Sequence, residues 1–516
     1  MKKLSFFLAL ALALAMWTLP ACRREKPAVR TALRPNILVI MSDDHAAHAI
    51  SAYGSRLNTT PQIDRIAREG MLFRNCFCTN GICAPSRAVI LTSRYSHLNG
   101  LRDNAVAFDG AQMTFPKLLQ QNGYRTAMIG KWHLKSDPTG FDYWNILPGQ
   151  GDYYNPDLIE MGELKHHEGY VTDILTDLAV DFLEKSRDRT EPFLLMLHQK
   201  APHRSWEPAL RHLHLYDSVD IPAPDSLFDD YSGRSSAARD QEMTVKDHLR
   251  GPTDLKMGPA PERMNSAQKE VWEEAYGPKR EAFLKNPPEG KDLTLWKYRR
   301  YMEDYLACIA AVDESVGRVL DALERTGAAA NTLVVYTSDQ GFFLGDHGWF
   351  DKRFMYEESL RMPLLVRLPK VVPPGSVNEE LVMNLDFAPT FLDLAGIPAP
   401  REMQGRSLSG WLFGEKIPDW RKAIYYHYYE YPAVHMVKRH YGIRTRQFKL
   451  IHFYYDIDAW ELYDLDKDPG ELRSVYEEPA YLETRRGLEE ELRELQKRYG
   501  DSDELARRFI QEDLER

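Results

Sequence analysis

Short unbroken apolar runs alternate with amphipathic segments along most of the chain. Four runs predict strands, at residues 35–41, 124–129, 193–197 and 332–336; the run at 124–129 is strand-like, and the other three are unbroken apolar runs. Apolar residues at helical spacing predict helices at 63–69, 117–122, 173–185, 298–325 and 386–396. This alternation predicts an α/β fold in which a mixed, mainly parallel sheet is sandwiched by helices.

The pattern changes twice. Residues 204–297 hold many prolines and charges and few apolar runs, and we expect an insertion with some helix over one end of the sheet. From residue 420, aromatic and alternating positions (425–431, 441–454, 460–465) precede a charged amphipathic helix at 481–499. We therefore expect an α/β domain over 35–419 and a C-terminal α+β subdomain over 420–516, built on a small antiparallel sheet with one helix.

The N-terminus has the features of a signal peptide. Lys2 and Lys3 precede an apolar stretch at residues 6–17, which is shorter than the roughly 20 residues a membrane span needs. The ending Leu19-Pro20-Ala21-Cys22 resembles a bacterial lipobox, although Pro20 is unfavoured there and cleavage at another bond stays open. An uncleaved anchor is the alternative. We expect a signal peptide over 1–22, a polar linker over 23–34, and a periplasmic or outer-membrane-anchored lipoprotein of a Gram-negative bacterium.

Composition narrows the function classes. The chain has 66 Lys and Arg against 76 Asp and Glu, a net charge of −10, which excludes binding nucleic acid by bulk charge. A local cationic pocket remains compatible with an anionic ligand. Five cysteines in 516 residues are too few for a disulfide scaffold.

Polar side chains recur where the predicted strands end. Asp43 and Asp44 follow the first strand, His198 follows the third, and Asp339 and Gln340 follow the fourth. The carboxyl ends of parallel strands meet at one edge of a sheet, where sites gather. Adjacent carboxylates repel one another unless a cation joins them, and oxygen ligands suit Ca²⁺ or Mg²⁺. Each pair alone also fits a turn or a helix cap, but both pairs together favour a metal.

Two motifs resemble those of the type I sulfatases. Residues 83–87 (CAPSR), followed by Leu91-Thr92, resemble the segment in which that family oxidises a cysteine to formylglycine. In this first motif, Ser93 stands after Leu91-Thr92 where the family usually has Gly, and residues 123–133 (GYRTAMIGKWH) match the family's second motif. A buried structural thiol is the alternative for Cys83. The resemblance runs from Asn36 to about Leu465 and implies an alkaline-phosphatase-like domain followed by a smaller one.

The resemblance implies a role for each matching residue. The metal, usually Ca²⁺, would be held by Asp43, Asp44, Asp339, Gln340 and the modified Cys83, with Gln340 standing where many relatives have Asn. Formylglycine would come from Cys83 through a formylglycine-generating or anaerobic sulfatase-maturating enzyme. The hydrated aldehyde would be held by Arg87, Lys131 and His133, the leaving oxygen would be near His203, and the sulfate would be gripped by Lys352.

Sulfate ester chemistry accounts for these residue types. Attack on sulfur moves charge onto the bridging oxygen, so fixed cations and a metal stabilise the transition state. One hydroxyl of the hydrated aldehyde would attack sulfur, His203 would protonate the leaving alcohol, and the second hydroxyl would expel sulfate. Taken singly, each of these lysines and histidines is more often structural; together with Cys83 they favour catalysis.

Three further stretches, at residues 200–208, 348–357 and 441–445, resemble bacterial exolytic sulfatases of glycosaminoglycan or mucin sugars, most of all N-acetylglucosamine-6-O-sulfatases. Asp346 and His347 precede Lys352, and a basic cluster with His427 and Lys438 lies in the C-terminal region. The candidate substrate-binding residues are Asp346, His347, His435, Arg439 and His440. For Asp346, capping a turn is the alternative.

Several functions remain open from the sequence. A sulfatase of another regiospecificity, acting on iduronate 2-sulfate or galactose 6-sulfate, is the first alternative. A phosphodiesterase or phosphonate hydrolase of the same fold is a second alternative, and a non-catalytic binder of sulfated glycans is a third. The sequence does not give the oligomeric state.

Overall fold

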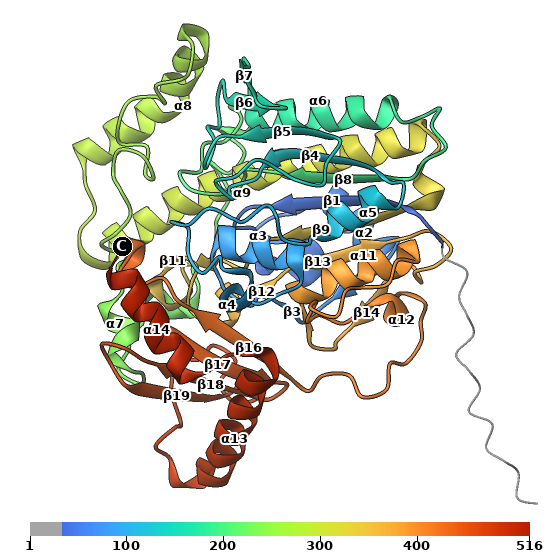
Figure 1. The fold of residues 1–516 in the computed structure, drawn as a ribbon. Coiled ribbons are helices and arrows are strands. Elements are labelled where there is room, and N and C mark those ends of the chain that lie inside the picture. The colour runs from blue at the N-terminus through green and yellow to red at the C-terminus, as the bar shows by residue number, and fades with distance from the viewer. Residues whose placement is uncertain (1–32, 516) are drawn as a thin grey trace, which may run out of the picture. The chain divides into compact units, whose positions relative to one another are not determined.

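The computed structural model describes residues 33–515 and is built around a central sheet of ten strands (Figure 1). The strands lie in the order β14-β2-β13-β9-β1-β8-β4-β5-β6-β7. The expected signal peptide, Cys22 and nearly all of the linker lie outside the described residues. The strands of this sheet are β1 (Asn36–Ser42), β2 (Met71–Phe73), β4 (Arg125–Lys131), β5 (Tyr143–Leu147), β6 (Asp157–Glu160), β7 (Glu163–His166), β8 (Phe193–His198), β9 (Thr332–Ser338), β13 (Leu364–Arg367) and β14 (Ser376–Asn378).

The four predicted apolar runs form the parallel centre of the sheet, β9-β1-β8-β4. Pairing turns antiparallel at β13 on one side and at β6 and β7 on the other. Since both faces of the centre are covered, β1 is apolar at every position from Ile37 to Met41. Ile37, Val39 and Met41 belong to one core, and the residues between them belong to the other.

Helices cover both faces of the sheet (Figure 1). One core contains residues of α3, α5 and α11, and the other contains residues of α2, α6 and α9. The predicted α/β sandwich is confirmed. The helices of at least seven residues in this part are α2 (Pro61–Arg68), α3 (Cys83–Thr92), α5 (Phe115–Gln121), α6 (Val171–Glu184), α8 (Ser266–Lys285), α9 (Gly290–Arg325) and α11 (Phe387–Ala395).

The long helix α9 begins at Gly290, eight residues before the predicted start. Of residues 290–297 only Thr294 is buried, so these first two turns lack the buried stripe that marks the rest of the helix. The insertion contains α8, whose Asn265 and Gln268 form a reciprocal capping box, and the short α7 (Ser236–Asp240). The prediction of some helix in this region is confirmed.

The C-terminal region is an antiparallel sheet with two helices. Its strands are β16 (Ala423–Tyr428), β17 (His440–Thr445), β18 (Phe448–Phe453) and β19 (Ala459–Asp464). The predicted helix is α13 (Leu482–Tyr499), but a second helix, α14 (Asp503–Leu514), was not predicted. Its apolar residues at 505, 506, 509 and 510 have helical spacing and the Ser502 side chain caps its start, so the sequence carried a signal for this helix that was not used.

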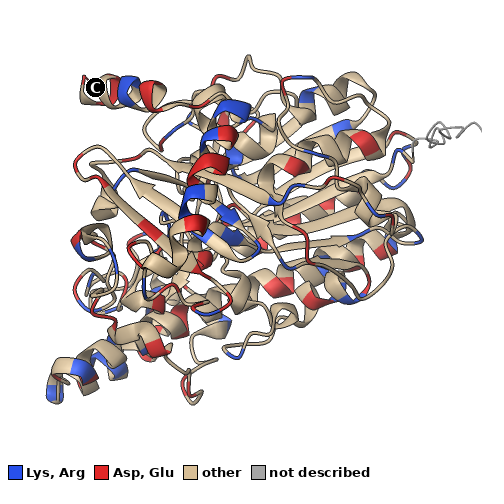
Figure 2. Cartoon of the chain, turned by 90° about the horizontal axis from the view of Figure 1, so that it is seen from below, with Lys and Arg blue, Asp and Glu red and all other residues tan. Residues whose placement is uncertain are grey.

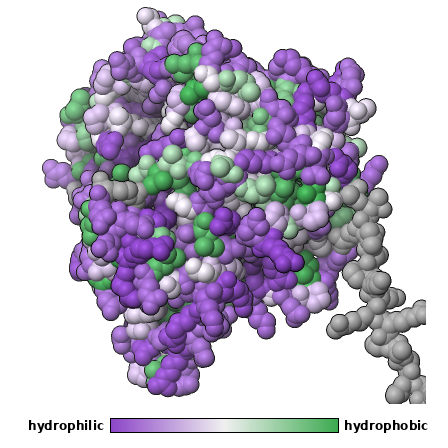
Figure 3. Space-filling view, in the orientation of Figure 1, coloured by the Kyte–Doolittle hydropathy of each residue, from purple (hydrophilic) through white to green (hydrophobic). Residues whose placement is uncertain are grey.

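Residues 34–516 form one compact unit, so the division near residue 420 stays a prediction. Acidic and basic residues are interspersed along the elements in Figure 2, and apolar residues are scattered over the face in Figure 3.

Among the described helices, none is long and apolar enough to cross a membrane. Small sheets complete the fold: β10 (Phe343–Leu344) with β11 (Phe350–Asp351), and β12 (Arg361–Met362), β3 (Cys76–Phe77) and β15 (Val382–Met383).

Candidate active site

Carboxylates from two neighbouring strands meet at the carboxyl edge of the central sheet. Asp43 and Asp44 follow β1, and Asp339 follows β9, which pairs with β1 through Ser42 and Ser338. One carboxylate oxygen from each of the three lies within 4.8 Å of the others, and all three side chains are buried. Three carboxylates this close need positive charge between them or beside them.

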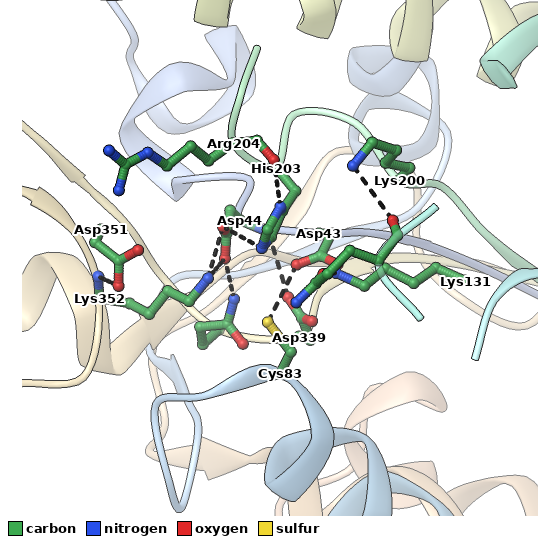
Figure 4. A network of polar contacts seen from close by, with 12 residues as sticks. Asp43, Asp44, Cys83, Lys131, Lys200, His203, Arg204, Asp339, Asp351 and Lys352 are labelled. Carbon is green, nitrogen blue, oxygen red and sulfur yellow. Dashed lines mark hydrogen bonds and ion pairs between the residues drawn. The ribbon is translucent and has the colours of Figure 1, made fainter. Parts of the chain in front are cut away.

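Cys83 is the first residue of α3 and points at this cluster (Figure 4). Its Sγ lies 3.5 Å from Asp43 Oδ1, and the side chain of Asn104 accepts the backbone N–H of Ala84 at 3.1 Å. Burial raises the pKa of the Cys83 thiol to about 12. The unmodified thiol is therefore neutral at physiological pH and a poor nucleophile.

Three cations surround the carboxylates. Arg87 Nη2 lies 2.9 Å from Asp339 Oδ2 and 3.3 Å from Asp43 Oδ2, and its Nη1 donates to the Lys131 carbonyl at 2.6 Å. Lys352 Nζ donates to both oxygens of Asp44, at 2.6 and 2.7 Å, and Lys131 pairs with Asp43. All three cations are almost completely buried, so their charge acts in a poorly screened environment.

The carboxylates differ in charge preference. Burial raises the pKa of Asp44 to about 7, and the nearby Asp339 and Asp351 add to this against the effect of Lys352. Burial also opposes the ionisation of Asp339, but Arg87, Lys131 and Lys352 outweigh it and lower the pKa of that carboxyl. The fixed cations therefore favour the carboxylate form of Asp339, whereas burial disfavours that form at Asp44.

The donor set fits a hard divalent cation. Gln340 donates its amide N–H to Asp44 Oδ1 at 2.5 Å, which leaves its own Oε1 buried and without a hydrogen-bond partner in the described part of the chain. Three carboxylates and this unsatisfied amide oxygen are the all-oxygen ligands that Ca²⁺ prefers and Mg²⁺ accepts. The predicted ligands Asp43, Asp44, Asp339 and Gln340 are thus brought together with Cys83.

Two predicted histidines lie at the same site. His203 Nε2 is 3.8 Å from Asp44 Oδ2, and its Nδ1 donates to the Arg204 carbonyl at 2.7 Å, which leaves Nε2 to face the carboxylates. Burial, Lys131 and Lys352 hold the pKa of His203 well below its usual range. His133 follows β4; burial and Lys131 lower its pKa to about 2, and its Nδ1 is buried with no partner among the described residues.

The sequence analysis missed two polar groups at the site. Gln150, between two glycines after β5, accepts from Lys131 Nζ at 2.5 Å through its side chain and from Lys200 Nζ at 3.2 Å through its carbonyl. Asp351, next to Lys352, pairs with Arg353 and lies 3.3 Å from His435 Nε2. Gln150 could have been found as a polar residue in a glycine-flanked loop after a strand. For Asp351 the only signal in the sequence was its position next to Lys352.

The five candidate substrate-binding residues do not share one pocket. His435 lies beside Asp351, near Lys352 (Figure 4 shows Asp351 and Lys352). Arg439 lines a cavity next to α14, and Asp346 lines a different cavity, where its carboxylate lies 3.4 Å from His48 Nε2.

His347 and His440 are both buried and contact protein groups. His440 is fully buried, its Nδ1 donates to the Lys438 carbonyl at 2.8 Å, and its Nε2 accepts the N–H of Met355 at 3.1 Å. His347 is 1% exposed and has Arg234 at 2.8 Å from Nδ1. Both ring nitrogens of His440 are thus bonded to the backbone, whereas His347 Nε2 has no hydrogen-bond partner among the described residues, and a substrate-binding role stays a prediction for both.

The chain is similar to proteins of known activity. A family model described as "Sulfatase" matches residues 35–397, and one described as "N-sulphoglucosamine sulphohydrolase, C-terminal" matches residues 345–498. An N-acetylglucosamine-6-O-sulfatase of Bacteroides thetaiotaomicron is 52% identical over 513 residues, which cover 96% of this chain and 91% of the relative. The human N-acetylglucosamine-6-sulfatase is 28% identical over 422 residues, covering 77% of this chain and 67% of the human protein.

A solved structure extends this similarity to the fold. It has a TM-score of 0.89 and 52% identity to this chain, and the match covers 91% of this chain and 99% of the other. It is described as a complex with its substrate D-glucosamine-2-N,6-O-disulfate.

Proposed function

Because this chain belongs to the sulfatase family, we propose that it hydrolyses the 6-O-sulfate of N-acetylglucosamine or N-sulfated glucosamine in glycosaminoglycans or mucins. The observation that carries the proposal is Cys83, whose Sγ lies 3.5 Å from Asp43 Oδ1 inside the cluster of carboxylates and fixed cations. The relative that is 52% identical bears the name of this activity, and the similar solved structure was described with a 6-O-sulfated glucosamine.

Two groups would complete the site. Oxidised to formylglycine, residue 83 would supply a hydrated aldehyde as nucleophile, and Ca²⁺, held by Asp43, Asp44, Asp339 and Gln340, would polarise the sulfuryl oxygens. The neutral thiol of Cys83 supports this assignment, since its raised pKa leaves little thiolate to attack sulfur directly. The maturation partner would be a formylglycine-generating or an anaerobic sulfatase-maturating enzyme.

The protein's own cations stabilise charge that develops on the sulfuryl group. Arg87 holds Asp339 and Asp43 in place. Lys131 and Lys352 contact the carboxylates from opposite sides (Figure 4), so a sulfate entering between them meets ammonium groups on both flanks. Preorganised charges of this kind act most strongly on the transition state, where the negative charge is more localised.

His203 is placed to protonate the leaving oxygen. Its Nδ1 bond to the Arg204 carbonyl fixes the ring, so the proton for the sugar oxygen would come from Nε2. Without substrate, burial and the nearby Lys131 and Lys352 lower the pKa of His203 and disfavour its protonated form. An anionic sulfate ester between His203 and those lysines would favour the protonated ring.

Sugar recognition would use the groups beside Lys352. Asp351 presents a carboxylate that accepts hydrogen bonds from sugar hydroxyls, and its neighbours Arg353 and His435 hold that carboxylate in place. Because Asp351 and Lys352 are neighbours in the chain, one short segment would bind a sugar hydroxyl through Asp351 and the sulfate through Lys352.

Export is part of the proposal. The lysine-flanked apolar segment at the N-terminus and the Leu19-Pro20-Ala21-Cys22 sequence support secretion with lipid attachment at Cys22, in the periplasm or on the outer membrane. Sulfated glycans of host tissues are extracellular polymers, so an exported enzyme meets its substrate.

A panel of sulfated monosaccharides tests the activity. Purified protein, co-expressed with a maturation enzyme, is assayed on N-acetylglucosamine 6-sulfate, galactose 6-sulfate and iduronate 2-sulfate, with p-nitrophenyl phosphate as the phosphate ester. Sulfate release from N-acetylglucosamine 6-sulfate at the highest kcat/KM is expected. Preference for another sulfated sugar or for the phosphate ester would overturn the assignment.

A further inference from the structure

A short loop after β5, residues 148–153, contacts two active-site residues that lie far apart in the sequence. It begins with a tight turn, in which the N–H of Gly151 donates to the carbonyl of Pro148 at 2.9 Å. Gly149 and Gly151 have φ angles of 54° and 70°, a left-handed conformation that glycine adopts without strain. The turn therefore holds Gln150, which lies between the two glycines, in a defined place.

The side chain of Gln150 contacts Lys131. Its Oε1 accepts a hydrogen bond from Lys131 Nζ at 2.5 Å, and the same ammonium group pairs with Asp43. An ammonium group has three N–H bonds, so these two partners fix its direction and leave one N–H for the substrate or the hydrated aldehyde. Because Lys131 is fully buried, its direction depends on these protein partners.

The other end of the loop contacts the backbone of His203. The hydroxyl of the buried Tyr153 donates to the His203 carbonyl at 2.6 Å, and the His203 N–H donates to the Lys200 carbonyl at 3.0 Å. The backbone of His203 is thus held on both sides. Tyr153 helps to fix the point from which the His203 ring projects towards Asp44.

Lys200 connects the two ends of the loop. Its Nζ lies 3.2 Å from the Gln150 carbonyl and 4.7 Å from the centre of the Tyr153 ring, over which it makes a cation–π contact. Figure 4 shows Lys200 on the side of the site where Lys131 lies. The contacts therefore form one connected set that runs from Lys131 to His203 through the loop.

We propose that Gln150 and Tyr153 are positioning residues, which place Lys131 and His203 so that both face the same sulfate ester. The proposal rests on the proposed function, in which Lys131 stabilises charge on the sulfuryl group and His203 protonates the leaving oxygen. Gln150 acts through Lys131, and Tyr153 acts through His203. A displacement of a reacting group by about 1 Å costs about 10²-fold in rate, so small shifts of either residue are measurable.

The leaving group of the substrate tests the role of Tyr153. Tyr153→Phe removes only the hydroxyl and keeps the ring beneath Lys200. It is expected to lower kcat about fivefold to tenfold on N-acetylglucosamine 6-sulfate, but by less than about twofold on p-nitrophenyl sulfate, whose phenol leaves without an acid.

Tyr170→Phe is the matched control, because the Tyr170 hydroxyl donates to the carbonyl of Glu207 at 3.0 Å, in the same segment as His203. It should keep the wild-type ratio of the two rates. Equal losses on both substrates in Tyr153→Phe, or the same change of ratio in Tyr170→Phe, would overturn the role of Tyr153.

Two substitutions at one position test the role of Gln150. Gln150→Met keeps the length of the side chain but removes the acceptor for Lys131, and kcat is expected to fall about tenfold on both substrates, since they share the sulfuryl group. Gln150→Glu keeps an oxygen acceptor and should stay within about threefold of wild type. A Met variant as fast as wild type, or a Glu variant as slow as the Met variant, would contradict the role. Gln447→Met, at an exposed glutamine in the C-terminal region, is the control.

The wild-type enzyme in the same assays separates the outcomes. Without sulfate release from N-acetylglucosamine 6-sulfate, the proposed function fails, and the positioning roles fail with it. With sulfate release, but with Tyr153→Phe behaving like Tyr170→Phe and Gln150→Met behaving like Gln447→Met, only the positioning roles fail.

Discussion

Gln340 donates its side-chain N–H to Asp44 at 2.5 Å while its own Oε1 stays buried and without a hydrogen-bond partner in the described part of the chain. Leaving a buried acceptor unsatisfied costs about 1–3 kcal/mol. A divalent cation bound by this oxygen and by the Asp44 carboxylate would remove that cost, so this pair marks the metal site.

Metal binding should therefore stabilise the protein through Gln340. Calcium added to chelator-treated wild type is expected to raise the Tm, because a ligand that binds only the folded state stabilises it by mass action. Gln340→Leu should lose most of this rise, and Gln340→Asn, which keeps an amide oxygen, should retain part of it. Differential scanning calorimetry measures the shift; an equal calcium response in the Leu variant would contradict the ligand role.

Lys352 should carry much of the rate. Lys352→Ala is expected to lower kcat by about 10²- to 10³-fold, the loss found when one preorganised donor to developing charge is removed. Steady-state kinetics on N-acetylglucosamine 6-sulfate measures it. The exposed Lys416 provides the control, since Lys416→Ala should leave kcat unchanged. A Lys352→Ala enzyme within threefold of wild type would exclude this lysine from the site.

The role of His203 depends on the leaving group. An acid is needed when a sugar hydroxyl leaves but much less when an acidic phenol leaves. His203→Ala should therefore lower kcat about 10²-fold or more on a sugar sulfate and far less on p-nitrophenyl sulfate. His214→Ala, an exposed histidine nearby in the chain, is the control. Equal losses on both substrates would show that His203 acts in some way other than as the acid.

A buried network that ties α13 and α14 to the sheet should make stability depend on pH. Asp501 accepts from Tyr425 at 2.8 Å and lies 2.7 Å from His427 Nδ1. Burial opposes ionisation of Asp501, but His427 and His97 outweigh it and hold its pKa below the usual range. The folded pKa lies below the unfolded one, so this stabilisation is complete above pH of about 4 and is lost as the pH falls towards the folded pKa.

Asp501→Asn should lower the unfolding free energy by about 3 kcal/mol at pH 7, as breaking a buried pair does, and should flatten its fall in acid. Urea denaturation at a series of pH values measures both effects. Asp458→Asn removes an exposed carboxylate that also pairs with a histidine, and it should change little. An Asp501→Asn protein with the wild-type acid profile would assign the pH dependence to other groups.

The sequence predicted the carboxylate cluster because acidic residues follow two buried strands, and the carboxyl ends of parallel strands lie at one edge of a sheet. β1 and β9 are neighbours, so the residues that follow them, Asp44 and Asp339, must meet at one edge of the sheet. Cys83, Lys131 and His203 were found through motifs, and the structure brings them to the same edge. Their roles in catalysis stay predictions until the variants are measured.

The sequence did not show which of the buried C-terminal basic residues faces the active site. His435 and His440 lie five residues apart, but the first faces Asp351 and the second has both ring nitrogens bonded to the backbone. The direction of each side chain depends on packing between the two sheets, which no local pattern encodes. The same limit hid Gln150, whose role appears only when its loop folds over Lys131.

Mass spectrometry of the peptide carrying residue 83, from purified enzyme that releases sulfate from N-acetylglucosamine 6-sulfate, tests the central claim most directly. The aldehyde of formylglycine is expected at residue 83 in a fraction that rises with specific activity across preparations, and Cys83→Ala should be inactive. Full activity in a preparation whose residue 83 is entirely unmodified cysteine would contradict the account.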